Sequence, residues 1–146
     1  MRAVTHVLDT SAILAHYFDE PGAEMVERLW YDSVNRIAVC VLSLPELKGR
    51  LTVEVDDPQE VERAFREYVD ELTTTLIVDR RTADSAMLLR ESADTRLPLV
   101  DAVIAGCAHV HSAVLVHRDP HFASISRELV AQVVLPEKDA STESSR

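Results

Sequence analysis

Residues 37–46 read Ile-Ala-Val-Cys-Val-Leu-Ser-Leu-Pro-Glu, and the fold class follows from this stretch. Its first six residues form a continuous apolar run of strand length, which is typical of a strand covered on both faces in a parallel sheet. Ser43 then predicts the start of a helix, because its hydroxyl can cap the helix and Pro45 lies in the first turn, where a missing N–H costs nothing. A buried strand that leads directly into a helix indicates an α/β protein.

Short apolar runs and amphipathic segments alternate along the rest of the chain. We expect further strands over 4–8, 75–78, 113–116 and 130–135, and further helices over 12–18, 23–34, 58–72, 82–94 and 100–109. Strands separated by helices form βαβ units, so the pattern predicts a mostly parallel five-stranded sheet with helices on both faces. This domain would span residues 1–135, and the polar, serine-rich residues 136–146 are expected to form a disordered tail.

The composition excludes several classes of protein. The 146 residues suit one domain, and no run approaches the roughly 20 apolar residues that a membrane-spanning helix needs. The two cysteines, Cys40 and Cys107, cannot build a disulfide framework, so we expect a cytoplasmic protein. Three glycines are too few for a glycine-rich phosphate-binding loop, which excludes P-loop and dinucleotide-binding proteins.

The charge is negative and unevenly distributed. The formal net charge of −10 argues against a protein that holds nucleic acid by bulk charge alone. Residues 54–71 contain eight acids and two arginines, and phosphates would be repelled from this segment. Any nucleic acid would therefore bind on another part of the surface.

Four acids lie at or near the carboxyl ends of predicted strands: Asp9, Glu46, Asp101 and Asp119. Ligands of open α/β sheets gather at this edge. Carboxylates that converge in one cleft repel each other unless a cation joins them, and all-oxygen ligands are those that Mg²⁺ or Mn²⁺ prefers. Such a metal can polarise a phosphate and activate a water, so the chemistry that these acids support best is phosphodiester hydrolysis.

Each of these acids also has a purely structural interpretation. Asp9 could cap the helix that follows it, and Glu46 could complete a capping box with Ser43. Asp101 could stabilise the positive end of its helix, and Asp119, which precedes a proline, could belong to a turn. The occurrence of all four at one edge of the expected sheet favours a shared functional site.

Four motifs, in this order and spacing, resemble those of the PIN-domain family, and most closely its VapC toxins. They are Leu-Asp-Thr-Ser-Ala at 8–12, Ser-Leu-Pro-Glu-Leu at 43–47, Leu-Pro-Leu-Val-Asp-Ala-Val-Ile-Ala at 97–105 and Val-His-Arg-Asp-Pro-His-Phe at 116–122. The resemblance covers about residues 4–135. It implies a three-layer α/β/α fold, Mg²⁺- or Mn²⁺-dependent ribonuclease activity, a homodimer and a cognate antitoxin that blocks the site.

The same resemblance assigns roles to individual residues. The family's acidic quartet is matched by Asp9, Glu46, Asp101 and Asp119, which would be both catalytic residues and metal ligands. The supporting hydroxyl near the metal is matched by Thr10 or Ser11.

Two histidines depart from the family pattern. His117 stands where the family commonly has Thr or Ser, two residues before the last acid. Its imidazole could support the acids by donating a hydrogen bond, could bind phosphate when protonated, or could lie on the surface at the strand end. His121 stands where the family often has another acid or an amide, which would weaken binding of a second metal.

Three cations near the acids are candidates for binding RNA: Lys48, Arg50 and Arg118. They could clamp phosphates close to the carboxylates. The alternative is that they are solvated or form ion pairs, such as a Glu46–Arg50 pair one helical turn apart.

Two other classes of function compete with a nuclease. A receiver-type phosphoacceptor domain would have adjacent acids after its first strand, where this chain has Asp9 alone, and a lysine near the last acid, which is missing near Asp119. A PIN-like binding module without catalysis is the stronger alternative, because His117 and His121 replace the usual residues.

Overall fold

The computed structural model describes residues 3–138. One sheet is formed by β1 (His6–Leu8), β2 (Ile37–Cys40), β3 (Thr74–Leu76), β4 (Val114–His117) and β5 (Gln132–Val134). The strand order is β3-β2-β1-β4-β5, and every neighbouring pair is parallel. The predicted five-stranded parallel sheet is confirmed.

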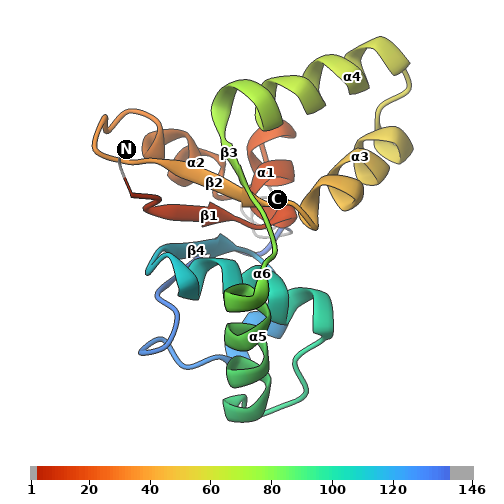
Figure 1. The fold of residues 1–146 in the computed structure, drawn as a ribbon. Helices are drawn as coiled ribbons and strands as arrows, with labels where there is room; N and C mark the ends of the chain where they lie inside the picture. Colours follow the sequence, from red (N-terminus) through yellow and green to blue (C-terminus); the bar gives the residue numbers. More distant parts are fainter. Residues whose placement is uncertain (1–2, 139–146) are drawn as a thin grey trace, which may run out of the picture.

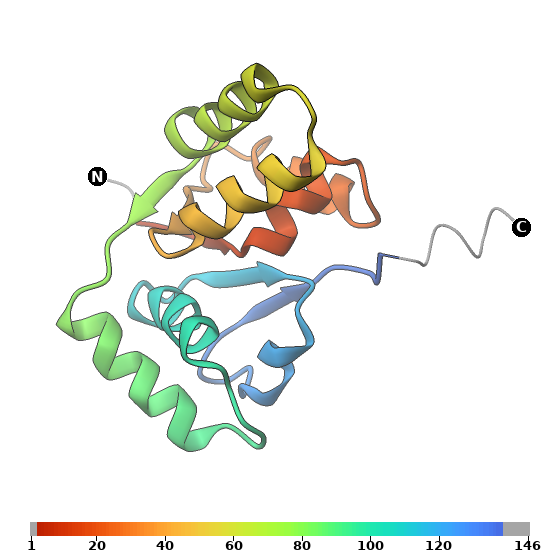
Figure 2. The ribbon, with the colours of Figure 1, turned by 90° about the vertical axis from the view of Figure 1, so that its right-hand side faces the viewer.

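Helices cover both faces of the sheet (Figures 1 and 2). One face carries α1 (Thr10–Tyr17), α2 (Ala23–Leu29), α3 (Ser43–Glu54), α4 (Pro58–Arg66) and the π-helical segment η1 (Glu67–Leu72). The other carries α5 (Arg80–Ser92), α6 (Leu99–Val110) and the 3₁₀ turn η2 (Pro120–Ser124). The three-layer α/β/α architecture is therefore confirmed.

The central strands β1 and β2 are mostly apolar because each face of the sheet has its own core. Val7 packs into the core beneath α5 and α6, whereas its neighbour Leu8 packs into the core beneath α1 and α3, and both side chains are fully buried. In β2, Ala38 and Cys40 face the first core, and Val39 faces the second. Burial on both faces explains the continuous apolar run of β2.

The central position of β1 determines where the acids meet. Since β1 pairs with β2 on one side and β4 on the other, the carboxyl ends of all three strands lie side by side. Asp9 directly follows β1, Asp119 lies two residues beyond β4, and Glu46 lies in the first turns of the helix after β2.

Several predicted elements end earlier than the sequence pattern indicated. The helix predicted over 23–34 stops at Leu29, because the Asn35 side chain donates a hydrogen bond to the Leu29 carbonyl (3.0 Å) and Asp32 turns the chain by accepting from the Val34 N–H (3.0 Å). The strand predicted over 75–78 stops at Leu76, where pairing with β2 ends, and Ile77 is exposed.

The helix predicted over 58–72 is not α-helical to its end. It widens into η1, where the Thr73 hydroxyl donates to the Tyr68 carbonyl (2.7 Å) and the Trp30 indole donates to the Leu72 carbonyl (2.9 Å). These side chains satisfy carbonyls at the C-terminal end of the helix, and periodicity in the sequence does not reveal them.

The predicted capping role of Ser43 is wrong. The chain already has helical dihedral angles at Leu42 (φ −67°, ψ −21°), so Ser43 lies inside the first turn of α3 and is not at its cap. Its hydroxyl oxygen is buried and has no hydrogen-bond partner among residues 3–138. The capping box of Ser43 with Glu46 is therefore not formed.

Residues 139–146, most of the predicted tail, lie outside the described residues. Lys138 is described, and its Nζ lies 3.1 Å from the Glu20 carboxylate. The domain boundary at residue 135 and the disorder of the tail stay predictions. Within the described chain, no helix has the length and apolar character needed to cross a membrane.

Candidate metal and active site

Asp9 caps a helix and also belongs to the acidic cluster. Its extended backbone places the carboxylate at the start of α1, where Oδ2 accepts hydrogen bonds from the Ser11 N–H (3.2 Å) and the Ser11 hydroxyl (2.7 Å). Asp9 is 5% exposed, and burial raises the pKa of its carboxyl even though Ser11 favours the charged form. The nearby Asp119 adds to the rise in pKa by repulsion.

Ser11 joins two parts of the site. While its hydroxyl donates to Asp9, its oxygen accepts from the backbone N–H of Arg118 (2.9 Å). The Asp9 N–H in turn donates to the Val116 carbonyl in β4 (3.0 Å). These bonds fix the start of α1 against the loop that carries Asp119.

His117 holds the same loop from within the core. Its Nδ1 accepts from the Asp119 N–H (3.1 Å), so Nε2 carries the hydrogen and donates to the Gln132 side-chain oxygen (2.8 Å). The ring is 2% exposed and stacks 4.7 Å from Phe122, and burial lowers its pKa. His117 is therefore a buried, neutral residue, and the two interpretations that placed it on the surface or in contact with phosphate are wrong.

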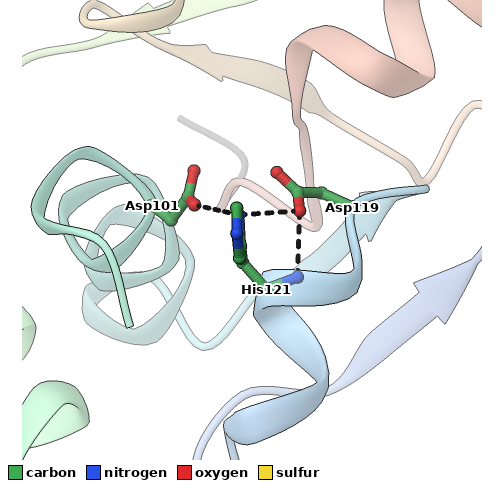
Figure 3. Close-up of side chains that lie close together, drawn as sticks. All are labelled: Asp101, Asp119 and His121. Atoms are coloured by element: carbon green, nitrogen blue, oxygen red, sulfur yellow. Dashed lines mark hydrogen bonds and ion pairs between the residues drawn. The ribbon is translucent and has the colours of Figure 1, made fainter. Parts of the chain in front are cut away.

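Asp101 and Asp119 face each other across His121 (Figure 3). Asp101 lies in the first turn of α6, and Asp119 caps η2 by accepting from the His121 N–H (2.9 Å). The His121 Nδ1 is 3.1 Å from Asp101 Oδ2 and 3.1 Å from Asp119 Oδ1. Burial, followed by repulsion from Asp119 and Asp9, raises the pKa of Asp101 to about 6.

Glu46 is the most open of the four acids. Partial burial raises the pKa of its carboxyl, and repulsion from Asp9 and, more weakly, from Asp119 raises it further. Glu46 also contributes to the raised pKa of Asp101. The four predicted acids thus converge closely enough for repulsion among them to oppose the ionisation of Asp9, Glu46 and Asp101.

Thr10 presents an unsatisfied oxygen to this cluster. Its hydroxyl is buried and lies close enough to Glu46 to favour the charged carboxylate, yet it completes no hydrogen bond of normal geometry within residues 3–138. The four carboxylates, three of them with a raised pKa, and this unpartnered hydroxyl form an oxygen-rich donor set. This donor set fits a divalent cation such as Mg²⁺ or Mn²⁺.

The three predicted RNA-binding cations are engaged in ion pairs with other acids. Lys48 pairs with Glu62, and its Nζ lies 4.9 Å from the centre of the Phe65 ring. Arg50 pairs with Glu54 (2.6 Å), not with Glu46 as the alternative interpretation expected. Their contact with RNA stays a prediction.

Arg118 is the most deeply held of the three cations. Its guanidinium lies 2.7 Å from the Glu20 carboxylate, and the two side chains are 14% and 13% exposed. Burial opposes ionisation of Glu20, but Arg118 and Lys138 outweigh it and keep the pKa of Glu20 below its usual value. The backbone of Arg118 contacts Ser11 at the site, whereas its side chain is directed to Glu20.

His121 was expected only to weaken binding of a second metal, yet its side chain lies directly between Asp101 and Asp119. The Asp-Pro-His sequence at 119–121 was a usable signal, because an aspartate that caps a helical turn through the N–H two residues on brings that residue's side chain beside its own.

The family model of the PIN domain matches residues 6–128 of the chain. No curated protein matches it by sequence. Among solved structures, it is similar to VapBC2 from Rickettsia felis bound to a promoter DNA fragment, with a TM-score of 0.72 and 17% identity over 91% of this chain and 100% of that one.

Two further solved structures share the fold. DNA-bound VapBC from Salmonella typhimurium matches with a TM-score of 0.71 and 18% identity, over 90% of this chain and 98% of that one. VapC20 from Mycobacterium tuberculosis, described as a toxin that cleaves the sarcin-ricin loop, matches with a TM-score of 0.62 and 15% identity, over 82% and 93% of the two chains. At these identities the likeness concerns the fold alone.

Proposed function

The chain belongs to the PIN domain family, and on that premise we propose that it is a divalent-metal-dependent endoribonuclease that serves as the toxin of a toxin–antitoxin pair. The observation that carries the proposal is the convergence of Asp9, Glu46, Asp101 and Asp119, whose mutual repulsion helps to raise the pKa values of Asp9, Glu46 and Asp101. Similarity to toxins of solved toxin–antitoxin complexes supports the biological role.

The metal is Mg²⁺ or Mn²⁺, held by the four carboxylates. When bound, a divalent cation stabilises charge on a phosphate and makes a water more acidic. Asp9, Asp101 and Asp119 are less exposed than Glu46 and are held by hydrogen bonds or by His121, so they provide the fixed ligands.

Glu46 has the additional role of accepting a proton. It is the most open of the four acids, and its pKa lies above the usual glutamate value. A raised pKa makes a carboxylate a stronger base at neutral pH. Glu46 is therefore placed to take the proton from the water that attacks phosphorus, while Ser11 and His117 keep Asp9 and Asp119 in place.

RNA would reach the acids past Lys48, Arg50 and Arg118. Glu62 and Glu54, the partners of Lys48 and Arg50, belong to the acidic segment of residues 54–71, so that segment borders the path. Each of these cations would have to exchange its present carboxylate partner for a phosphate. Exposed ion pairs such as Arg50–Glu54 contribute little to stability, so this exchange costs little there.

The protein would act in the cytoplasm as a homodimer and would be silenced by a cognate antitoxin. The most direct inhibitor would be an apolar helix beside the site that directs an Arg or Lys to the carboxylates, so antitoxin and metal would compete.

Incubation of total RNA with the purified protein and Mg²⁺ or Mn²⁺ tests the proposal. We expect cleavage that EDTA abolishes and added metal restores, and the variant Asp119→Asn should lose it. Asp94→Asn, a change of the same kind at an exposed residue just beyond α5, should cleave like the parent. Metal binding without any cleavage would favour the binding-module alternative.

A further inference from the structure

Asp101, Asp119 and His121 form a cluster that differs in chemistry from an all-carboxylate site. Each offers one ligand atom, and these atoms lie within 4.8 Å of one another. In residues 3–138 this is the one group of three or more His, Cys, Asp or Glu side chains with that property. Figure 3 shows the imidazole edge between the two carboxylates.

We propose that His121 Nδ1 is a direct ligand of the divalent cation, together with Asp101 and Asp119, and that it makes the protein prefer Mn²⁺ to Mg²⁺. The proposal rests on the proposed function in that it assumes a metal at the acids. It adds a nitrogen ligand and a choice of ion.

The separations of the donor atoms fit adjacent positions around an octahedral ion. Ligands about 2.1 Å from such an ion lie about 3.0 Å from their neighbours. The Nδ1 atom lies 3.1 Å from Asp101 Oδ2 and 3.1 Å from Asp119 Oδ1. The imidazole therefore needs little movement to share an ion with both carboxylates.

The backbone holds His121 in this position. The His121 N–H donates to Asp119 Oδ1 (2.9 Å), and the Asp119 N–H donates to His117 (3.1 Å). Phe122, the next residue, is fully buried and fixes η2 against the sheet. His121 itself keeps 56% of its side chain exposed, so a hydrated ion can approach it from solvent.

A nitrogen ligand changes which ion is favoured. Mg²⁺ is a hard cation that takes oxygen ligands and dehydrates reluctantly, whereas transition-metal ions accept imidazole nitrogen more readily. Thr10 and the remaining carboxylates supply oxygen donors that suit both ions. The imidazole is thus the group that separates Mn²⁺ from Mg²⁺ at this site.

Pulsed electron paramagnetic resonance of the Mn²⁺-loaded protein measures nitrogen coordination directly. We expect a ¹⁴N coupling of directly bound imidazole in the parent and in His111→Ala, and none in His121→Ala. His111 is a matched control, because it is exposed and lies at the opposite end of α6 from Asp101. Circular dichroism verifies that each variant is folded.

Calorimetric titration with Mn²⁺ and Mg²⁺ separately gives the second readout. The Mn²⁺ affinity should fall at least about tenfold in His121→Ala, since even changes in residues that only support a ligand cost tenfold or more. The Mg²⁺ affinity should fall less, because Mg²⁺ gains less from a nitrogen ligand, so the ratio of Mn²⁺ to Mg²⁺ affinity should fall as well. In His121→Asp, which supplies an oxygen ligand in place of nitrogen, the ratio of Mn²⁺ to Mg²⁺ affinity should also fall.

The outcomes separate this inference from the proposed function. Mn²⁺ binding without ¹⁴N coupling, or a coupling that persists in His121→Ala, overturns the role of His121 and leaves a metal-dependent nuclease intact. Failure of the parent to bind either ion overturns both. An unchanged affinity ratio in both His121 variants contradicts the proposed ion preference.

Discussion

Asp9 has both a structural role and a proposed functional role. Its carboxylate caps α1 through Ser11 and also faces the other three acids. The same hydrogen bonds that hold the start of α1 therefore hold a proposed metal ligand. A change that removes the charge but keeps the cap separates the two roles.

Asp9→Asn should abolish most of the thermal stabilisation that Mg²⁺ or Mn²⁺ gives the protein. An ion present at about 100 times its Kd adds about 2.7 kcal/mol to the free energy of unfolding, which raises Tm by several degrees. Asparagine can still accept the Ser11 N–H, so the metal-free variant should remain folded.

Asp79→Asn is the control, because Asp79 caps α5 in the same manner, through the Thr82 N–H (3.0 Å). Thermal unfolding with and without metal compares the three proteins. A metal-induced shift in Asp9→Asn equal to that of the parent would remove Asp9 from the site.

Asp101 gives the site a distinctive pH dependence. Its pKa is about 6 in the folded protein against an ordinary value of 3.8, so the folded state binds this proton more tightly than the unfolded state does. Without metal, protonation of Asp101 therefore stabilises the fold as pH falls from above 6 toward 4.

Urea unfolding of the parent and of Asp101→Asn in chelator, at pH 7.5 and pH 5, measures this contribution. The parent should gain stability relative to the variant at the lower pH. In the presence of metal, the parent should instead lose stability relative to the variant at the lower pH. The cation requires the ionised carboxylate, so its binding weakens below about pH 6. An identical pH dependence in parent and variant would contradict the assignment.

Among the elements, the first turn of α1 and the loop between β4 and η2 act as one unit. Ser11 connects them, because its hydroxyl donates to Asp9 and accepts from the Arg118 N–H. The acids on the two elements thus keep their separation through a single side chain.

Ser11→Ala should lower the free energy of unfolding by about 1 kcal/mol and weaken metal binding, because the Arg118 N–H loses its acceptor. Ser11→Thr retains the hydroxyl and should preserve both properties. Ser92→Ala, which removes an exposed hydroxyl bonded to the Leu88 carbonyl at the end of α5, serves as control and should change little. Chemical unfolding and metal titration check these expectations, and normal metal affinity in Ser11→Ala would refute the connecting role.

The strands and helices that carry the acids can be predicted from the sequence. Apolar runs indicate the strands, and the acids stand out because they follow these runs directly or within a few residues. It does not predict contacts that depend on neighbouring elements. The His117–Gln132 hydrogen bond joins strands 15 residues apart, and nothing in the sequence around His117 reveals that its ring is buried. Likewise, the pairing of Arg118 with Glu20 spans 98 residues and becomes visible only in the folded chain.

At the scale of the whole molecule, the protein is expected to be a dimer. The chain has a mass of 16.3 kDa, and the family resemblance implies pairing about a two-fold axis. Light scattering should therefore give about twice that mass. A value near that of the single chain over a wide concentration range would contradict the prediction.

The central claim is that the four acids hold a metal and direct water onto an RNA phosphodiester. Hydrolysis adds the water oxygen to phosphorus, whereas attack by the ribose 2′-hydroxyl leaves a 2′,3′-cyclic phosphate. Mass spectrometry of the products of RNA cleavage in H₂¹⁸O with Mg²⁺ or Mn²⁺ tells the two reactions apart. The predicted result is a terminal phosphate that carries ¹⁸O, formed only with metal and lost in Asp119→Asn. Cyclic phosphate ends without ¹⁸O, or cleavage that EDTA and Asp119→Asn leave unchanged, would contradict the claim.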